Sequence, residues 1–213
     1  MKKNQNNYLL NKRLQFLNYA KAYVSENGFT QNTLKNISNK YKLDLNEIEL
    51  LFPEENVDLI KFALDQLNSE LEDYCKKIDL IRLPTHKRIR KILLSKIFIM
   101  NNDKFFYKKI FLNLFIPKKY FSLPKQLYNS VDQIWFIAGD SSADFNFYTK
   151  RLILSGIYLR VMLFFFNNDD QVGLESILDE NLKRVSKIPE IKSKLKIFKD
   201  FLPKIANYVK NSY

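Results

Sequence analysis

The sequence predicts an all-α protein of nine or ten helices. Apolar residues recur at spacings of three and four along most of the chain, which is the period of a helix face. Glycine and proline number only 4 and 6 in 213 residues, too few for the many tight turns of a barrel or sandwich. The length suits one large domain or two small ones with a packed core.

Residues 1–53 predict a head of three short helices. Apolar side chains within Leu14–Val24 share one helix face, and Gly28 follows where a helix ends in the left-handed conformation. Thr30 opens a second short helix, and Asp44 caps a third that ends before Pro53. Short helices joined by a short turn match a helix-turn-helix unit.

Residues 54–186 predict a larger helical body, and residues 187–213 a separate C-terminal helix. The predicted helices of the body are Val57–Leu80, Thr85–Met100, Asp103–Ile116, Leu123–Ala138, Asp144–Phe166 and Val172–Ser186. The pattern then continues from Pro189 to Lys210, with an interruption at Pro203 because proline breaks a helix interior.

Several classes of active site are excluded by the residue inventory. A single cysteine, Cys75, rules out an internal disulfide and a multi-thiolate metal site. A single histidine, His86, rules out the sites that need two or three imidazoles. Because we find no nucleophile–base pair, phosphate loop or metal cluster, we expect no catalytic activity.

A three-helix head on a helical body is the layout of TetR-type repressors, which bind DNA through the third helix. Leu43–Ile60 contains no lysine or arginine and six acids, namely Asp44, Glu47, Glu49, Glu54, Glu55 and Asp58. Affinity for DNA comes largely from basic side chains that neutralise phosphates. We therefore expect no nucleic-acid partner, and a TetR-type regulator that senses a lipid is the alternative.

The formal net charge of +12 is concentrated in two regions. Lys76–Lys119 carries thirteen basic residues against two acidic ones, which is typical of a solvated helix face. Lys183–Lys210 carries nine against two and also has an apolar stripe. Such a helix can lie in a membrane interface, fold against its own domain or pair with another helix. The residues expected at a membrane are Ile191, Leu195, Phe198, Leu202, Ile205, Lys194 and Lys199.

The chain is expected not to cross a membrane. Its first residues lack the apolar run of a secretory signal and the arginines of a mitochondrial transit peptide. The best candidate span, Leu152–Phe166, is shorter than the roughly 20 apolar residues required and contains Arg160.

The most specific segment begins at Trp135. It reads Trp-Phe-Ile-Ala-Gly-Asp-Ser-Ser-Ala-Asp-Phe-Asn-Phe-Tyr-Thr-Lys-Arg and predicts a helix that stops at Gly139 and a capped restart, with Ser141 and Asp144 at capping-box spacing. One face of the new helix holds Asp144, Phe147, Tyr148 and Arg151. Two aromatics and an arginine are typical of an interface centre. The alternative is a partly buried helix start in which Asp144 pairs with Arg151.

The motif Ala-Gly-Asp-x-Ser-x-Asp-Phe-Asn-(aromatic)-Tyr-Thr-(Lys/Arg)-Arg resembles the signature of the ninth coenzyme Q biosynthesis protein family. Outside Trp135–Asp170 the resemblance rests on helix order. It implies a TetR-like fold and a lipid-binding accessory protein of ubiquinone synthesis, without catalysis, that presents a quinone precursor to the di-iron demethoxyubiquinone hydroxylase. A homodimer is expected by analogy, and the only ligand expected is an isoprenoid lipid or phospholipid.

The resemblance also implies where the partners bind. The family's hydroxylase-facing patch falls on Asp144, Asn146, Phe147, Tyr148 and Arg151. The family often has tryptophan at Phe147, so this chain keeps the apolar anchor but lacks the indole N–H. The C-terminal helix matches the family's membrane-contacting helix, which implies a cytoplasmic protein peripheral on a bacterial inner membrane, or on the matrix side of the mitochondrial inner membrane.

The long helix after Arg151 is apolar on nearly every side, as in the buried centre of a bundle. Small residues interrupt it, so an elongated apolar cavity is expected between it and phenylalanine-rich neighbours. The residues expected to contact lipid are Trp135, Leu152, Ser155, Gly156, Leu159, Met162, Leu163, Phe111 and Phe115.

Overall fold

The computed structural model describes residues 2–114, 123–140 and 145–186, and these residues form nine helices and no strand. The helices are α1 (Lys2–Asn27), α2 (Thr33–Tyr41), α3 (Leu45–Leu51), α4 (Asn56–Lys76), α5 (Thr85–Asn101), α6 (Lys104–Leu114), α7 (Leu123–Ile137), α8 (Phe145–Asn167) and α9 (Gln171–Ser186). The predicted all-α class is confirmed. The C-terminal helix with its seven membrane residues, the proposed capping box and Phe115 lie outside the described residues.

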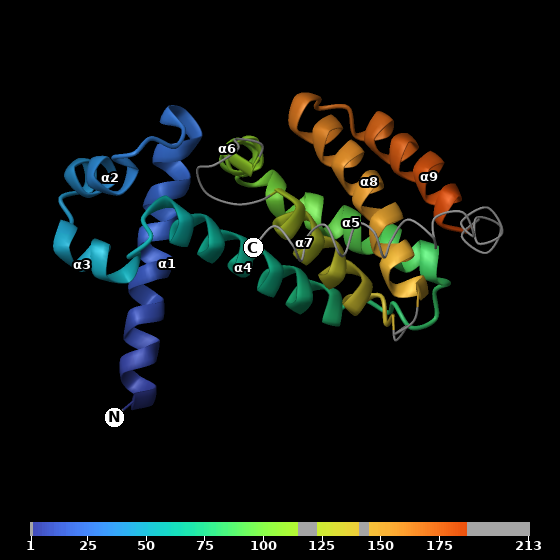
Figure 1. The fold of residues 1–213 in the computed structure, drawn as a ribbon, viewed down its shortest axis with the longest axis horizontal. Coiled ribbons are helices and arrows are strands. Elements are labelled where there is room, and N and C mark those ends of the chain that lie inside the picture. The colour runs from blue at the N-terminus through green and yellow to red at the C-terminus, as the bar shows by residue number, and fades with distance from the viewer. Residues whose placement is uncertain (1, 115–122, 141–144, 187–213) are drawn as a thin grey trace, which may run out of the picture.

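Helices α1 to α3 form a head at one end of the molecule (Figure 1). Gly28 ends α1 with a φ of 72°, in the left-handed conformation that its position predicts. The Asp44 side chain accepts a hydrogen bond of 3.0 Å from the backbone N–H of Asn46 and so caps α3. Helix α2 begins later than predicted, at Thr33, whose hydroxyl accepts a 2.7 Å bond from the backbone N–H of Thr30.

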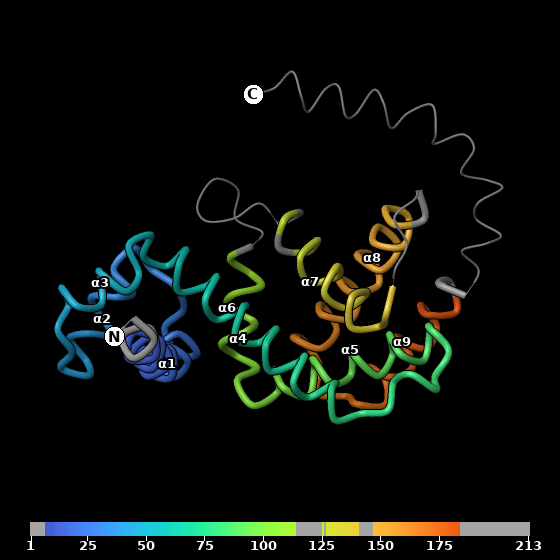
Figure 2. Tube along the Cα trace, turned by 90° about the horizontal axis from the view of Figure 1, so that it is seen from below, coloured from blue at the N-terminus to red at the C-terminus, as the bar shows by residue number. Residues whose placement is uncertain are grey.

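Helix α4 leaves the head and runs into the body, as Figures 1 and 2 both show. Within the body α5 is central, because it packs against α4, α6, α7 and α9. Helix α8 packs between α7 and α9, and α6 lies against α1, which joins the head to the body a second time. The core includes Phe106, Trp135 and the apolar face of α5. Among the described helices, none has the length and apolar character to span a bilayer.

Candidate functional site

The turn between α7 and α8 is built around Gly139. Its φ of 79° lets two backbone bonds close the end of α7, from the Gly139 N–H to the Phe136 carbonyl (2.9 Å) and from the Asp140 N–H to the Trp135 carbonyl (3.0 Å). Arg88 of α5 donates a 3.0 Å bond to the Ala138 carbonyl. The turn therefore fixes where Asp140 lies.

A partly buried network of charges ties this turn to α8. The Arg151 guanidinium donates to Asp132 of α7 (2.7 Å) and to Asp140 (3.1 Å), and Lys150 donates to the other Asp140 oxygen (2.6 Å). Asp140 and Arg151 are both buried. Buried charges are tolerated when they are paired and hydrogen-bonded in this way.

The network holds an aromatic pair at the surface. The guanidinium carbon of Arg151 lies 3.3 Å from the centroid of the Phe147 ring, and the Phe147 and Tyr148 rings meet edge-on at 5.2 Å. Tyr148 is 66% exposed, and Phe147 is partly exposed. Arg151 therefore orients Phe147 from beneath, and Tyr148 points outward beside it.

The predicted docking face is assembled in part. Phe147, Tyr148 and Arg151 come together, but Arg151 is only 6% exposed, so the expectation of an arginine within the exposed patch is corrected. Its partners in the structure are Asp132 and Asp140, two residues that sequence reasoning did not assign. Asp144 lies outside the described residues, as does the side chain of Asn146 in the first turn of α8.

A small apolar cavity lies in the body between α4, α6, α7 and α8. Its volume is about 40 Å³, room for only a few water molecules. The lining comprises Leu64, Leu67, Met100, Tyr107, Ile110, Phe111, Leu127, Ser130, Tyr158, Leu159, Met162 and Phe166. Phe111, Leu159 and Met162, three of the residues expected to contact lipid, line it. The expected elongated cavity is not open here, because large side chains fill the space.

Other predicted lipid contacts lie elsewhere. Leu152 is 71% exposed, and Gly156 and Leu163 are also on the outer face of α8. Trp135 is buried beneath Lys150, whose ammonium lies 5.3 Å from the indole centroid, and the Ser155 hydroxyl donates to the Arg151 carbonyl at 2.7 Å. These five residues do not line this cavity, and their contact with lipid stays a prediction. Because α8 is apolar on nearly every side, its periodicity does not show which sides other helices cover.

The exposed apolar residues of α8 form one line, which we call the α8 stripe. It consists of Tyr148, Leu152, Gly156, Leu159 and Leu163, spaced by three and four residues, with Leu159 half-buried and the others exposed. The stripe continues the aromatic pair along about 22 Å of helix, taking 1.5 Å per residue.

Lys96 is a buried residue that sequence reasoning missed. It is 1% exposed, and its ammonium lies 3.3 Å from Asn68 Oδ1 and 5.4 Å from the centroid of the Tyr158 ring. No carboxylate pairs with it among the described residues, and burial lowers its pKa to about 8. Tyr158 also lines the cavity, whereas Lys96 itself does not. The signal was a lysine on the apolar face of α5, between Leu93 and Met100.

Groups suited to metal binding or covalent chemistry are sparse in the described part of the chain. No cluster of three His, Cys, Asp or Glu residues is found there. Cys75 is buried, and burial raises the pKa of its thiol, which suppresses the reactive thiolate.

Comparison with solved structures defines the class of fold. The chain is similar to a TetR transcriptional regulator from Nitrosomonas europaea, with a TM-score of 0.67 over 83% of this chain and 99% of the other. Sequence identity is 15%, so the likeness concerns the fold. The protein is thus an all-α protein with a TetR-like fold, as predicted.

The segment that carries the turn and α8 resembles a known protein family. Residues 122–189 match the COQ9 family model. Ubiquinone biosynthesis protein COQ9 of Rattus norvegicus is 56% identical over 32 residues, and COQ9-A of Xenopus laevis is 47% identical over 45 residues. Within this segment the chain is therefore similar to the COQ9 family. These stretches cover 15% and 21% of this chain and 10% and 14% of the two relatives, which are both mitochondrial proteins.

Proposed function

We propose that this protein is a non-catalytic accessory factor of ubiquinone biosynthesis that binds an isoprenoid lipid and presents it to the demethoxyubiquinone hydroxylase. The observation that carries the proposal is the aromatic pair at the surface, the exposed Tyr148 and the partly exposed Phe147, held from beneath by the Arg151 network. This pair lies in the segment that matches the COQ9 family, and the rat and frog relatives are named for ubiquinone biosynthesis.

The proposed docking surface is the aromatic pair together with the α8 stripe. Aromatic side chains supply most of the binding energy where they fill pockets on a partner. Tyr148 offers a large exposed ring, and Leu152 and Leu163 extend the apolar surface along the helix. The charges beneath pre-organise this surface, so that little ordering is needed on association.

Lipid binding in the body requires the cavity to widen. A volume of about 40 Å³ is too small for an isoprenoid tail, so bound lipid must displace side chains. Met100 and Met162 line the cavity, and methionine adapts its shape more readily than other apolar residues. Lys96 gives the cavity a polar neighbour whose ammonium can donate to an oxygen of a head group. Burial of the tail would contribute about 25 cal/mol to the free energy of binding for each Å² of apolar surface removed from water.

The membrane contact is assigned to the C-terminal segment. Its apolar stripe and lysines suit an anionic bilayer surface, where each lysine adds about 1 kcal/mol. We expect the full chain to float with liposomes rich in anionic lipid. We expect a chain that lacks Pro189–Tyr213 not to float with them. Equal flotation of the two forms would contradict this part of the proposal.

The docking surface is tested by co-purification with the hydroxylase. We expect Tyr148→Ala to reduce recovery of the hydroxylase by about tenfold or more, as for an interface hot spot. Tyr128→Ala is the matched control, because Tyr128 is also an exposed tyrosine but lies on α7. Equal losses in both variants would contradict docking through the aromatic pair. Mass spectrometry of solvent extracts tests lipid binding separately, and an extract without lipid would count against it.

A further inference from the structure

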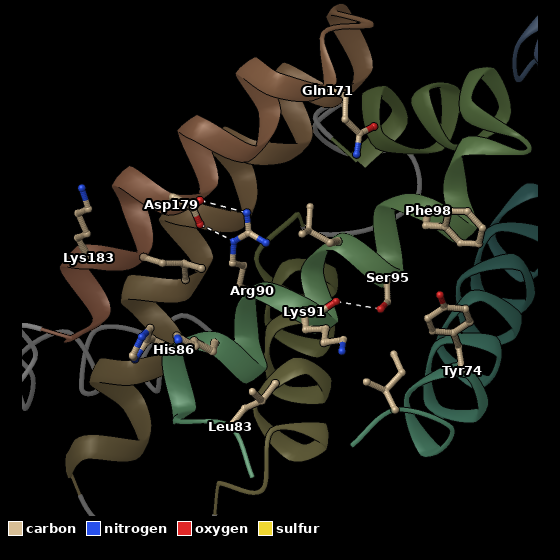
Figure 3. Close-up of a pocket in the computed structure, with 14 residues that line it drawn as sticks. Tyr74, Leu83, His86, Arg90, Lys91, Ser95, Phe98, Gln171, Asp179 and Lys183 are labelled. Atoms are coloured by element: carbon tan, nitrogen blue, oxygen red, sulfur yellow. Dashed lines mark hydrogen bonds and ion pairs between the residues drawn. The ribbon is translucent and has the colours of Figure 1, made fainter. Parts of the chain in front are cut away.

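A large open groove, separate from the central cavity, runs between α5 and α9 with α4 at one end (Figure 3). Its volume is about 1140 Å³, far larger than the cavity. The groove is lined by both apolar and basic side chains, including Tyr74, Lys87, Lys91, Leu94, Phe98 and Lys183.

The lining changes character along α5. His86 and Lys87 stand at the beginning of the helix, and Leu94 and Phe98 follow toward its end. Phe98 lies twelve positions after His86, which is about 18 Å along the helix. Figure 3 shows His86 and Lys183 at one end of the groove, and Tyr74 and Phe98 at the other. The Tyr74 and Phe98 ring centroids are 5.9 Å apart, so the apolar end is aromatic.

The positive charge of the groove is only partly neutralised. Arg90 is held by two carboxylates of α9, at 2.9 Å from Glu175 and 3.1 Å from Asp179. Lys87 and Lys91 lie one turn apart on the exposed face of α5, and among the described residues no carboxylate forms an ion pair with either. Two lysines on one helix face therefore offer their charge to a ligand.

We propose that this groove binds a single amphiphile with a phosphate head group. The phosphate contacts Lys87 and Lys91, and the apolar chain lies along Leu94 toward Phe98, which is 63% exposed in the free protein. Charge complementarity selects an anionic head, and the aromatic end of the groove selects a long apolar chain. The basic segment 187–213 is disfavoured as an occupant because its charge has the same sign as the rim.

The site is distinct from the cavity of the proposed function. Lys87, Lys91, Leu94 and Phe98 follow one face of α5, whereas Met100, which lines the cavity, lies on the opposite face with Lys96. Ligand binding in the groove can therefore be tested independently of lipid binding in the cavity.

Titration calorimetry with monomeric amphiphiles tests the proposal on the full-length chain. The titrants are dioctanoyl phosphatidylglycerol and farnesyl phosphate, which separate a phospholipid from an isoprenyl source of the same chemistry, and dioctanoyl phosphatidylcholine as the zwitterionic reference. We expect the double variant K87E/K91E to weaken binding of both anionic titrants by about tenfold or more, with a smaller change for phosphatidylcholine. Phe98→Gln should weaken all three titrants.

Two control variants match the test variants in the change of charge and in the exposure of the replaced side chain. K35E/K125E makes the same change of charge at two exposed lysines away from the groove, and Phe105→Gln removes a ring that is 66% exposed on α6. A photoreactive chain on phosphatidylglycerol should label Leu94, Phe98 or Leu182. Equal weakening in K35E/K125E, or binding of an acidic helical peptide but no lipid, would overturn the proposal. Labelling of Phe111 or Met162 instead would also overturn it, while supporting the cavity.

Discussion

Two buried cations in the same body show opposite solutions to the cost of burying charge. Arg151 has two carboxylates within 3.1 Å, and one of them is shared with Lys150. Lys96 has one amide oxygen at 3.3 Å and a tyrosine ring, with no ion pair among the described residues. Transfer of a charge out of water costs several kcal/mol unless such partners replace the lost hydration. Arg151 is compensated in this way, and Lys96 is not.

The difference in ion pairing indicates a different role for each residue. A compensated charge holds neighbouring elements in one geometry, and here it fixes the aromatic pair at the start of α8. An uncompensated buried charge lowers the stability of the fold. Ionisable groups whose pKa is perturbed by burial are often found at functional sites. The Lys96 ammonium lies 5.4 Å from the ring centroid of Tyr158, which lines the cavity, and under the proposed function the head group of a bound lipid would supply the missing partner.

Removal of the compensated cation should have the largest effect. Arg151→Met leaves Asp132 and the buried Asp140 without their arginine, and we expect the free energy of unfolding to fall by about 3–5 kcal/mol. Urea unfolding followed by circular dichroism measures the change. Arg160→Met is the control, because Arg160 is exposed on the same helix, and its effect should stay within about 0.5 kcal/mol. A similar small loss in Arg151→Met would mean that the network does not hold the turn.

Removal of the uncompensated cation should have the opposite sign. Lys96→Met keeps the length of the side chain and removes the buried charge, so we expect the free energy of unfolding to rise by about 2–3 kcal/mol at pH 7. If the variant is less stable than the wild type, then Lys96 has a partner that compensates it, and the contrast with Arg151 disappears.

The pH dependence of that difference gives a second measurement. The pKa of Lys96 falls from 10.5 to about 8 on folding, so the unfolded chain binds the extra proton between these values. The wild type should therefore gain stability relative to Lys96→Met as the pH rises from 8 to 10.5, and the difference should be constant below pH 8. A difference that does not change across this interval would contradict the lowered pKa.

The two cations also show how far the sequence predicts the molecule. Helix ends follow from local chemistry, and Gly28, Asp44 and Gly139 act where the pattern places them. The exposed Tyr148 was likewise predictable from its position near a helix start. The ion-pair partners of Arg151 could not be predicted, because Asp132 lies nineteen residues earlier on another helix. The side of α8 that faces the cavity could not be predicted, since nearly all sides of this helix are apolar.

The turn that presents Asp140 to Arg151 offers the smallest test. Gly139→Ala forces a side chain into a φ of 79° and brings its Cβ to 3.3 Å from Arg88 Nη1, so we expect a loss of about 1–2 kcal/mol. Gly156→Ala on α8 is the matched control, because its Cβ meets no atom within 4 Å, and alanine in a helix interior should stabilise by about 0.5–1 kcal/mol. Thermal unfolding of the two variants should therefore shift in opposite directions. A rise in the unfolding temperature of Gly139→Ala would show that the turn tolerates the loss of its left-handed glycine. The ion pairs alone would then connect α7 to the aromatic pair.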